Sequence, residues 1–251
     1  MAAYEIYPIC AGVFEHAEQS NFTYHNGAGT KLKAPILMYL VRGHGHNILV
    51  DTGPSDSAWA ARYHHPMIQT EEMKPVNAVK NLGVEPRDVD VIINTHLHWD
   101  HCFNNGDFPD AKIYVQKAEL QYAVAPLPIH GQFYESAIVG MQPRWVNDLP
   151  RIIPLDGDHT LFGGIEILLL PGHSPGFQGV LVTGKTGKFI ITGDAVPLAA
   201  NWEGNPVYGK IPPGIHVDLA QAYASLRRIE DTGAMPLHGH EAAVLNHAML
   251  T

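Results

Sequence analysis

Four stretches with the composition of β-strands each run into histidine or aspartate, and this pattern limits the folds open to the chain. The stretches are residues 89–94, 165–170, 188–192 and 234–237, and the polar side chains that follow them are His96, His98, Asp100, His101, His173, Asp194, His238 and His240. Loops at strand ends, held by a rigid sheet, are where catalytic residues concentrate. Four such ends can meet at one edge of a layered structure, so these side chains are expected to converge.

The remaining pattern predicts more strands than helices. Further strands are predicted at residues 36–41, 47–50, 112–115 and 180–183, and a glycine-containing turn at 43–46 joins the first two. Helices are predicted at 70–82, despite Pro75 near its start, at 117–125, and at 219–230, with Asp218 as N-cap. Residues 127–150 show little periodicity and are predicted to form a loop or lid. Strands joined partly by hairpins and partly by helices predict an α/β fold with two packed sheets and external helices.

Length and composition limit the number of domains and the class of partner. A chain of 251 residues is long for one domain and short for two, so a single domain over residues 1–251 is expected. The formal net charge of −9 argues against a nucleic-acid partner. The N-terminus lacks the pattern of a signal peptide, and no apolar run approaches the ~20 residues that span a bilayer. Two cysteines are too few for a disulfide framework, so a cytoplasmic protein without membrane association is expected.

The segment from His96 to His101 carries the most specific chemical signal. His96 and His98 alternate, so in extended backbone they point the same way. Asp100 and His101 follow where the chain must turn, which lets them address a second point nearby. With the residues at the other three strand ends there are seven nitrogen and oxygen donors, too many for one tetrahedral zinc and suited to two ions that share a carboxylate. A set of hydrogen-bonded histidines is the alternative, and it would be preferred for any one of them alone.

Four motifs resemble those of the metallo-β-lactamase superfamily. His-Leu-His-Trp-Asp-His at 96–101 is similar to its HxHxDH signature, and its companion motifs are similar, in order, to Ile-Leu-Val-Asp-Thr-Gly at 48–53, Pro-Gly-His-Ser at 171–174 and Thr-Gly-Asp at 192–194. The resemblance implies the αβ/βα sandwich and a site for two divalent ions, with zinc expected. It implies His96, His98 and His173 at the first ion, Asp100, His101 and His240 at the second, and Asp194 between them. His238 is the alternative to His240, which is preferred because an acid follows it, as in the lactonase branch.

Within the superfamily, the compact length and the segments Gln-Thr-Glu-Glu at 69–72 and Gly-His-Glu at 239–241 resemble the N-acyl homoserine lactonase and related lactonase branch. This implies a hydrolase that opens a small lactone ring by attack of a hydroxide between the two metals, with Asp100 handling the proton. A small-molecule lactone or ester is then the expected partner, and a homodimer is left open. The alternatives are hydrolysis of another cyclic ester or amide, an aryl ester or a phosphoester, and, from another class, a redox di-iron or non-catalytic metal-binding protein.

One position departs from that branch. Lactonases of this kind commonly place a tyrosine three residues beyond the bridging aspartate, and Pro197 stands there instead. His216 and Tyr208 are the candidates to replace the phenol in catalysis, although His216 could equally pack against a helix start. Phe133, Tyr134, Trp145 and Trp202 could line a pocket or belong to the core. Asp51 is expected to hydrogen-bond a ligand histidine or simply to end its strand.

Overall fold

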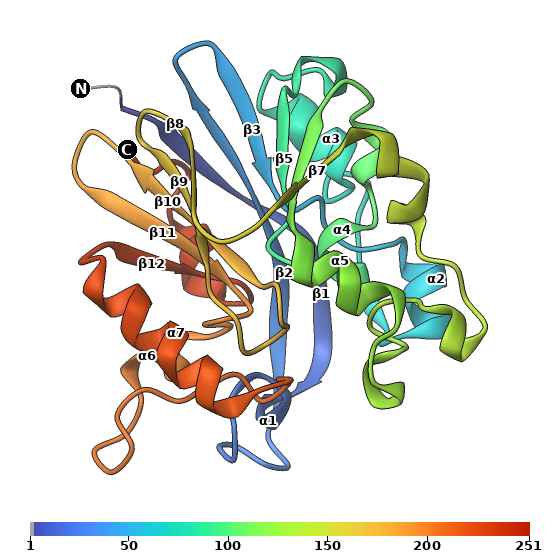
Figure 1. Ribbon diagram of the computed structural model, residues 1–251, viewed down its shortest axis with the longest axis vertical. Coiled ribbons are helices and arrows are strands. Elements are labelled where there is room, and N and C mark those ends of the chain that lie inside the picture. Colours follow the sequence, from blue (N-terminus) through green and yellow to red (C-terminus); the bar gives the residue numbers. More distant parts are fainter. Residues whose placement is uncertain (1–2) are drawn as a thin grey trace.

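The computed structural model describes residues 3–251, in which two mixed β-sheets pack face to face (Figure 1). The larger sheet has the strand order β4-β1-β2-β3-β5-β6-β7, and the smaller has the order β12-β11-β10-β9-β8. The strands of the larger sheet are β1 (Glu5–Glu18), β2 (Lys31–Gly43), β3 (His46–Val50), β4 (Met67–Ile68), β5 (Val91–Ile93), β6 (Lys112–Gln116) and β7 (Ile152–Leu155). The strands of the smaller sheet are β8 (His159–Phe162), β9 (Ile165–Leu169), β10 (Gln178–Thr183), β11 (Lys188–Gly193) and β12 (Met235–His238).

Helices cover the outer faces of both sheets. The α-helices are α1 (Gln19–Phe22), α2 (Ser57–Tyr63), α3 (Pro75–Asn81), α4 (Trp99–Cys102), α5 (Lys117–Val124), α6 (Ala199–Glu203) and α7 (Leu219–Asp231). In Figure 1, α7 lies outside the smaller sheet, and α3 and α5 lie outside the larger one. The predicted sandwich of two mixed sheets with external helices is therefore confirmed. No helix in the described part of the chain has the length and apolar composition needed to cross a bilayer.

Alternating side chains of the central strands enter different apolar layers. Ile48 and Val50 of β3 face the smaller sheet, whereas Leu49 between them packs among the residues under the outer helices. Successive side chains of a strand point to opposite faces, so a strand buried on both sides needs an uninterrupted apolar run, as this one has. One buried cluster takes residues from both sheets, including Ile93 of β5 and Ile191 of β11. Because the sheets share this core, we propose that the chain folds as the single domain expected from its length.

The strand ends meet for a topological reason. Strands β3, β5 and β6 are parallel, so their C-terminal ends lie at one edge of the larger sheet. In the smaller sheet β9 runs antiparallel to β10, β10 antiparallel to β11, and β11 parallel to β12, so β9, β11 and β12 end at a common edge. The two edges adjoin, because the Thr95 carbonyl after β5 accepts a hydrogen bond from the Gln178 amide of β10 at 2.9 Å.

The predicted turn at 43–46 forms a tight hairpin. Gly43 pairs with His46, and the two residues between them, His44 and Gly45, both have positive φ angles of 54° and 83°. Positive φ at both central positions is the type I′ geometry that matches the twist of a two-residue hairpin. The hairpin prediction is confirmed, and it joins β2 to β3 at the end of the sandwich opposite the converging strand ends.

The structure differs from the predicted secondary structure in several places. The helix predicted at 70–82 begins only at Pro75, because proline lacks an amide hydrogen and its fixed φ suits the first helical position. The 14-residue strand β1 was not predicted, since Pro8 and Gly12 interrupt its pattern. The segment predicted as a loop or lid contains short 3-10 helices at Pro128–His130, Ala137–Val139 and Arg144–Arg151. The other described 3-10 helices are Pro86–Asp88, Asn105–Asp107 and Ala242–Asn246.

Candidate metal centre

Side chains from four loops converge where the two sheet edges adjoin. They form two groups of residues that could hold a metal ion, and the candidate ligand atoms within each group lie within 4.8 Å of one another. The first group is His96, His98, His173 and Asp194, and the second is Asp100, His101 and His240. The structure thus brings together all seven residues proposed from the sequence, and it places His240 rather than His238 in the second group.

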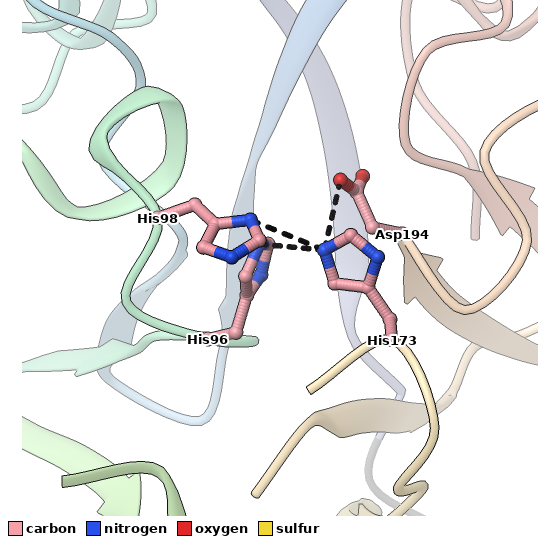
Figure 2. Close-up of side chains that lie close together, drawn as sticks. All are labelled: His96, His98, His173 and Asp194. Atoms are coloured by element: carbon pink, nitrogen blue, oxygen red, sulfur yellow. Dashed lines mark hydrogen bonds and ion pairs between the residues drawn. The ribbon is translucent and has the colours of Figure 1, made fainter. Parts of the chain in front are cut away.

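The first group is centred on His173 (Figure 2). The Nε2 atom of His173 lies 3.2 Å from Nε2 of His96 and 3.2 Å from Nδ1 of His98. His96 and His98 follow β5 of the larger sheet, whereas His173 follows β9 of the smaller sheet. The group therefore depends on the two sheets being held at the correct separation.

Asp194 lies between the two groups. One of its oxygens, Oδ2, is 3.5 Å from Nε2 of His173 in the first group. The other oxygen, Oδ1, is 3.1 Å from Nε2 of His240 and 3.5 Å from Nε2 of His101 in the second. A carboxylate with one oxygen facing each group is the arrangement that a residue shared between two ions requires.

Four histidines have a hydrogen-bond acceptor at Nδ1, which leaves the lone pair of Nε2 facing the site. The pairs are His96 with Thr95 Oγ1 at 3.0 Å, His101 with Asp51 Oδ2 at 2.8 Å, His173 with the Ile215 carbonyl at 2.8 Å, and His240 with the Pro35 carbonyl at 2.9 Å. Carbonyl and carboxylate partners of this kind fix the tautomer of metal-binding histidines. The Thr95 hydroxyl accepts from His96 because its own hydrogen is donated to Asp51 Oδ2, at 2.8 Å.

The polar atoms at the centre of this arrangement fit a bound cation. Among the described residues, His101 Nε2 and Asp194 Oδ1 are buried without any hydrogen-bond partner. The Nε2 lone pairs of His96 and His173 face each other across 3.2 Å. Buried polar atoms that make no hydrogen bond are costly, and a cation between them removes that cost. Imidazole nitrogens and carboxylate oxygens are also the donors that zinc and related divalent ions prefer.

Electrostatics separates the charged members of the site from the neutral ones. Burial, reinforced by the neighbouring histidines, holds the pKa of His96 well below its ordinary value, so this imidazole stays neutral. Burial raises the pKa of Asp194, but His240 and His101 outweigh it and hold the pKa well below the usual range. Burial lowers the pKa of His101, and Asp194 and the other nearby carboxylates more than compensate. The first group therefore presents neutral imidazoles beside an ionised carboxylate, whereas a cation that binds the second group must displace the proton that the carboxylates favour on His101.

Asp51 holds the second group in place, as expected for one of its two proposed roles. It is buried, with φ of 63°, and its carboxylate accepts from the Thr95 amide at 2.7 Å and from His101 Nδ1 at 2.8 Å. Aspartate and asparagine tolerate this left-handed backbone better than other non-glycine residues. The carboxylate therefore positions the imidazole of His101 and keeps its proton on Nδ1.

We expect Asp51→Asn to reduce metal affinity by about 10- to 100-fold, the usual loss when a partner of a ligand histidine is removed. Asparagine tolerates the left-handed backbone at this position as aspartate does. If its oxygen still accepts from the Thr95 amide, however, its NH2 group faces His101 Nδ1, which moves the histidine proton to Nε2. Competition with a chromophoric chelator measures the affinity. Asp90→Asn, at a half-exposed carboxylate that accepts from the Asn47 amide, is the matched control, and equal affinities in the two variants would contradict the prediction.

A cavity of about 300 Å³ opens directly over both groups. Its walls include the site residues His98, Asp100, His173, Asp194 and His240. Most of the other wall residues are apolar, among them Phe14, Phe22, Met67, Ile68, Trp99, Phe133, Pro197 and Ile215. Charged and polar side chains complete the lining, namely Glu15, His16, Glu18, Asn21, Lys31 and His65. A small molecule with an apolar part can therefore lie in this cavity with a polar group at the metal-binding side chains.

Of the three catalytic residues predicted from the sequence, one lines the cavity and two do not. Asp100 lines the cavity, with 13% of its side chain exposed. Tyr208 does not line the cavity. Residues 205 and 209 are joined by two hydrogen bonds between their backbone N–H and C=O groups, and in the turn between them Tyr208 is 70% exposed. His216 is also absent from the lining, since its Nδ1 is bonded to the Pro213 carbonyl at 3.0 Å and its ring packs against Tyr24. Neither residue is brought to the site, and Pro197 presents an apolar ring there.

Several residues of the site were not found from the sequence. Phe14 and Phe22 reach the cavity from β1 and α1, which the sequence pattern did not reveal. Of the aromatic residues proposed for the pocket, Phe133 lines it, whereas Trp145 belongs to the core under the outer helices.

His64 and Glu135 form a buried pair at 2.9 Å behind the cavity wall, and the His64 ring stacks on Trp99 at 4.1 Å between centroids. No spacing in the sequence indicates a partnership between residues 71 positions apart.

Comparison with known proteins agrees with this geometry. The Metallo-beta-lactamase superfamily matches residues 34–239 of the chain. An N-acyl homoserine lactonase from Bacillus sp is 32% identical over 215 residues, which cover 81% of this chain and 78% of the relative. The crystal structure of a quorum-quenching N-acyl homoserine lactone lactonase superposes with a TM-score of 0.74 at 27% identity, covering 97% of this chain and 94% of the other.

A second solved structure, of an N-acyl homoserine lactone hydrolase with the product N-hexanoyl-L-homoserine bound at the catalytic metal center, has the same TM-score at 26% identity, with 97% and 95% covered. The matched region begins within β2 and ends at Gly239, so it includes six of the seven candidate ligands and stops one residue before His240. By sequence and by fold, this chain belongs to the metallo-beta-lactamase superfamily.

Proposed function

We propose that this protein is a metal-dependent hydrolase that opens the ring of an N-acyl homoserine lactone or another small lactone. The observation that carries the proposal is the cavity, whose polar floor is formed by the two candidate metal groups and whose walls are apolar. The relatives named N-acyl homoserine lactonase support it, as does the related enzyme with an acyl homoserine product at its metal center. A lactone with an acyl substituent has the polar ring and the apolar chain that such a cavity accommodates.

In this proposal two divalent ions, with zinc preferred, are held by the seven converging side chains. His96, His98 and His173 hold the first ion, Asp100, His101 and His240 hold the second, and Asp194 contacts both. A pair of divalent ions supplies water with a lowered pKa and polarises a carbonyl oxygen. The hydrogen bonds of the histidines support the assignment. Four of them have an acceptor at Nδ1, which leaves the Nε2 lone pair facing the site.

The residues of this chain have three further tasks in the reaction. The apolar walls bind the substrate chain and exclude bulk water, which strengthens electrostatic interactions inside the cavity. Asp100 lines the cavity beside His101, with Oδ2 at 3.8 Å from Nε2 of that histidine, so its carboxylate can take the proton of the attacking water. The same group then returns the proton to the departing alkoxide of the opened ring, which balances the hydrolysis.

The test is hydrolysis of a lactone panel that varies in ring size and acyl-chain length, followed by acid release. We expect zinc-loaded protein to open acylated lactones. Treatment with a chelator should remove the activity, and added zinc should restore it, because the ions supply the chemistry and the side chains alone do not. The proposal is wrong if zinc-loaded protein with two bound ions releases no acid from any lactone.

Pro197 motivates a second candidate, hydrolysis of an aryl ester or phosphotriester by the same site. This proline lines the cavity where the lactonase resemblance implies a phenol, so the wall there has no hydroxyl to donate to a lactone carbonyl. Both substrate types should be assayed in parallel with the lactones. A kcat/KM for either that exceeds the best lactone value by tenfold or more would favour this second candidate.

A further inference from the structure

Glu119 is a buried carboxylate that the proposed reaction does not use. It lies in the first turn of α5, is 0% exposed, and accepts four hydrogen bonds. Its Oε1 accepts from the Leu97 amide at 3.0 Å and the Tyr134 hydroxyl at 2.9 Å. Its Oε2 accepts from the Ser174 hydroxyl at 2.6 Å and the Gly176 amide at 3.2 Å. A buried carboxylate is costly unless its oxygens accept hydrogen bonds, and here each oxygen accepts two. The role of Glu119 therefore depends on the groups that donate to it.

The partners of Glu119 belong to the two loops that carry the first metal group. Leu97 lies between His96 and His98, in the loop after β5 of the larger sheet. Ser174 directly follows His173, in the loop after β9 of the smaller sheet. One carboxylate therefore connects both sheets at the position where their histidines must meet.

Two further contacts tie this carboxylate to the metal-binding side chains. The Tyr134 ring, whose hydroxyl donates to Glu119, packs edge to face on His98 with 4.6 Å between centroids. Gly176 lies so close to α5 that a Cβ atom there would be 2.1 Å from the Glu119 backbone nitrogen. The loop after His173 thus rests directly on the helix that carries Glu119, and it has no room to move toward it.

We propose that Glu119 is a positioning residue that sets the separation between the His96–His98 pair and His173, and thereby the affinity of the first metal ion. This inference rests on the metal assignment in the proposed function. It concerns the first ion alone, because the donors to Glu119 adjoin only ligands of that ion, whereas Asp51 serves the second group through His101.

Glu119→Gln tests the inference with almost no change of shape. Each carboxylate oxygen accepts from one backbone amide, and a backbone amide cannot reverse its direction as a hydroxyl can. Whichever way the glutamine side chain is turned, its NH2 group faces either the Leu97 amide or the Gly176 amide, donor against donor. One of the two loops therefore loses the hydrogen bond from its backbone amide to α5.

The experiment is a titration of metal-free protein with Co²⁺ and with Zn²⁺ against a competing chelator, which resolves the affinities of the two ions. Cobalt absorption bands report the coordination of each ion separately from activity. We expect E119Q to bind the first ion about 10- to 100-fold more weakly, as for other residues that orient metal ligands, and the second within about threefold of wild type. Glu135→Gln is the matched control, because Glu135 is also buried and accepts from Trp59 and His64 but its carboxylate makes no hydrogen bond to either ligand loop.

The outcomes separate this inference from the proposed function. Wild-type protein that fails to bind two ions contradicts both. Two ions bound by wild type and with unchanged affinities by E119Q contradict the positioning role alone, as does an equal loss in E119Q and E135Q. If E119Q does not fold, Ser174→Ala removes one connection on the side of the smaller sheet, and an unchanged affinity for the first ion in that variant also overturns the inference.

Discussion

Asp194→Ala is expected to lower lactone hydrolysis by more than about 100-fold, which exceeds the usual loss for residues that only orient metal ligands. The carboxylate has one oxygen toward each candidate metal group, so its removal takes a donor from both ions at once. Burial lowers the pKa of His101 and His240, but the charge of Asp194 outweighs this, so its loss also removes the electrostatic stabilisation of positive charge at the second group. Metal content by atomic emission and initial rates on lactones measure the two losses together.

Asp158→Ala is the control for removal of an aspartate elsewhere. Asp158 is half-exposed and pairs with Arg228 on the surface, so its loss should leave metal content and rate within about twofold of wild type, since surface pairs contribute little.

His98→Ala should lose activity as Asp194→Ala does, together with the ion of the first group, because His98 contributes one of the nitrogen donors of that group. Full metal content and normal turnover in both the His98 and the Asp194 variants would contradict the whole assignment of the site.

Gly172→Ala is expected to destabilise the protein by roughly 3 kcal/mol, from overpacking and backbone strain of about 1–3 kcal/mol each. Gly172 has φ of 141°, and an added Cβ atom would lie 2.4 Å from backbone atoms of Ala222 in α7. The helix cannot easily retreat, because the Gly172 carbonyl accepts from the Val217 and Asp218 amides just before it. Since His173 is the next residue, the first metal group should be displaced as well. Urea unfolding of metal-free protein measures the change in stability.

Gly187→Ala provides the comparison for this variant. Gly187 lies in the turn between β10 and β11, its φ is outside the left-handed region, and an added Cβ atom would meet nothing within 4 Å. The free energy of unfolding of the Gly187→Ala variant should differ from that of wild type by no more than about 0.5 kcal/mol. Equal stability of the two alanine variants would show that α7 can shift to accommodate the methyl group.

The sequence alone was sufficient to predict the sandwich and to name the candidate metal ligands. Apolar runs such as residues 48–50 favour strands buried on both faces, and such strands occur inside a layered fold. The candidate ligands could be named because imidazoles and carboxylates follow four strand-like stretches, where functional residues concentrate, and because their motifs resemble those of the superfamily. The cap at Asp218, which accepts from the Gln221 amide at 2.9 Å, was equally visible because it depends on neighbours in the chain.

Only the tertiary structure decided how those residues are held and surrounded. That Glu119 connects the loops after β5 and β9, and that Tyr208 lies outside the cavity, both depend on distances between segments far apart in the chain. The cavity wall from β1 was hidden for the same reason, since Phe14 lies beside Trp99 only after the sheet has formed. Local preferences are set by neighbouring residues and can be read from a pattern, whereas the separation of two loops is set by the packing of the whole core between them.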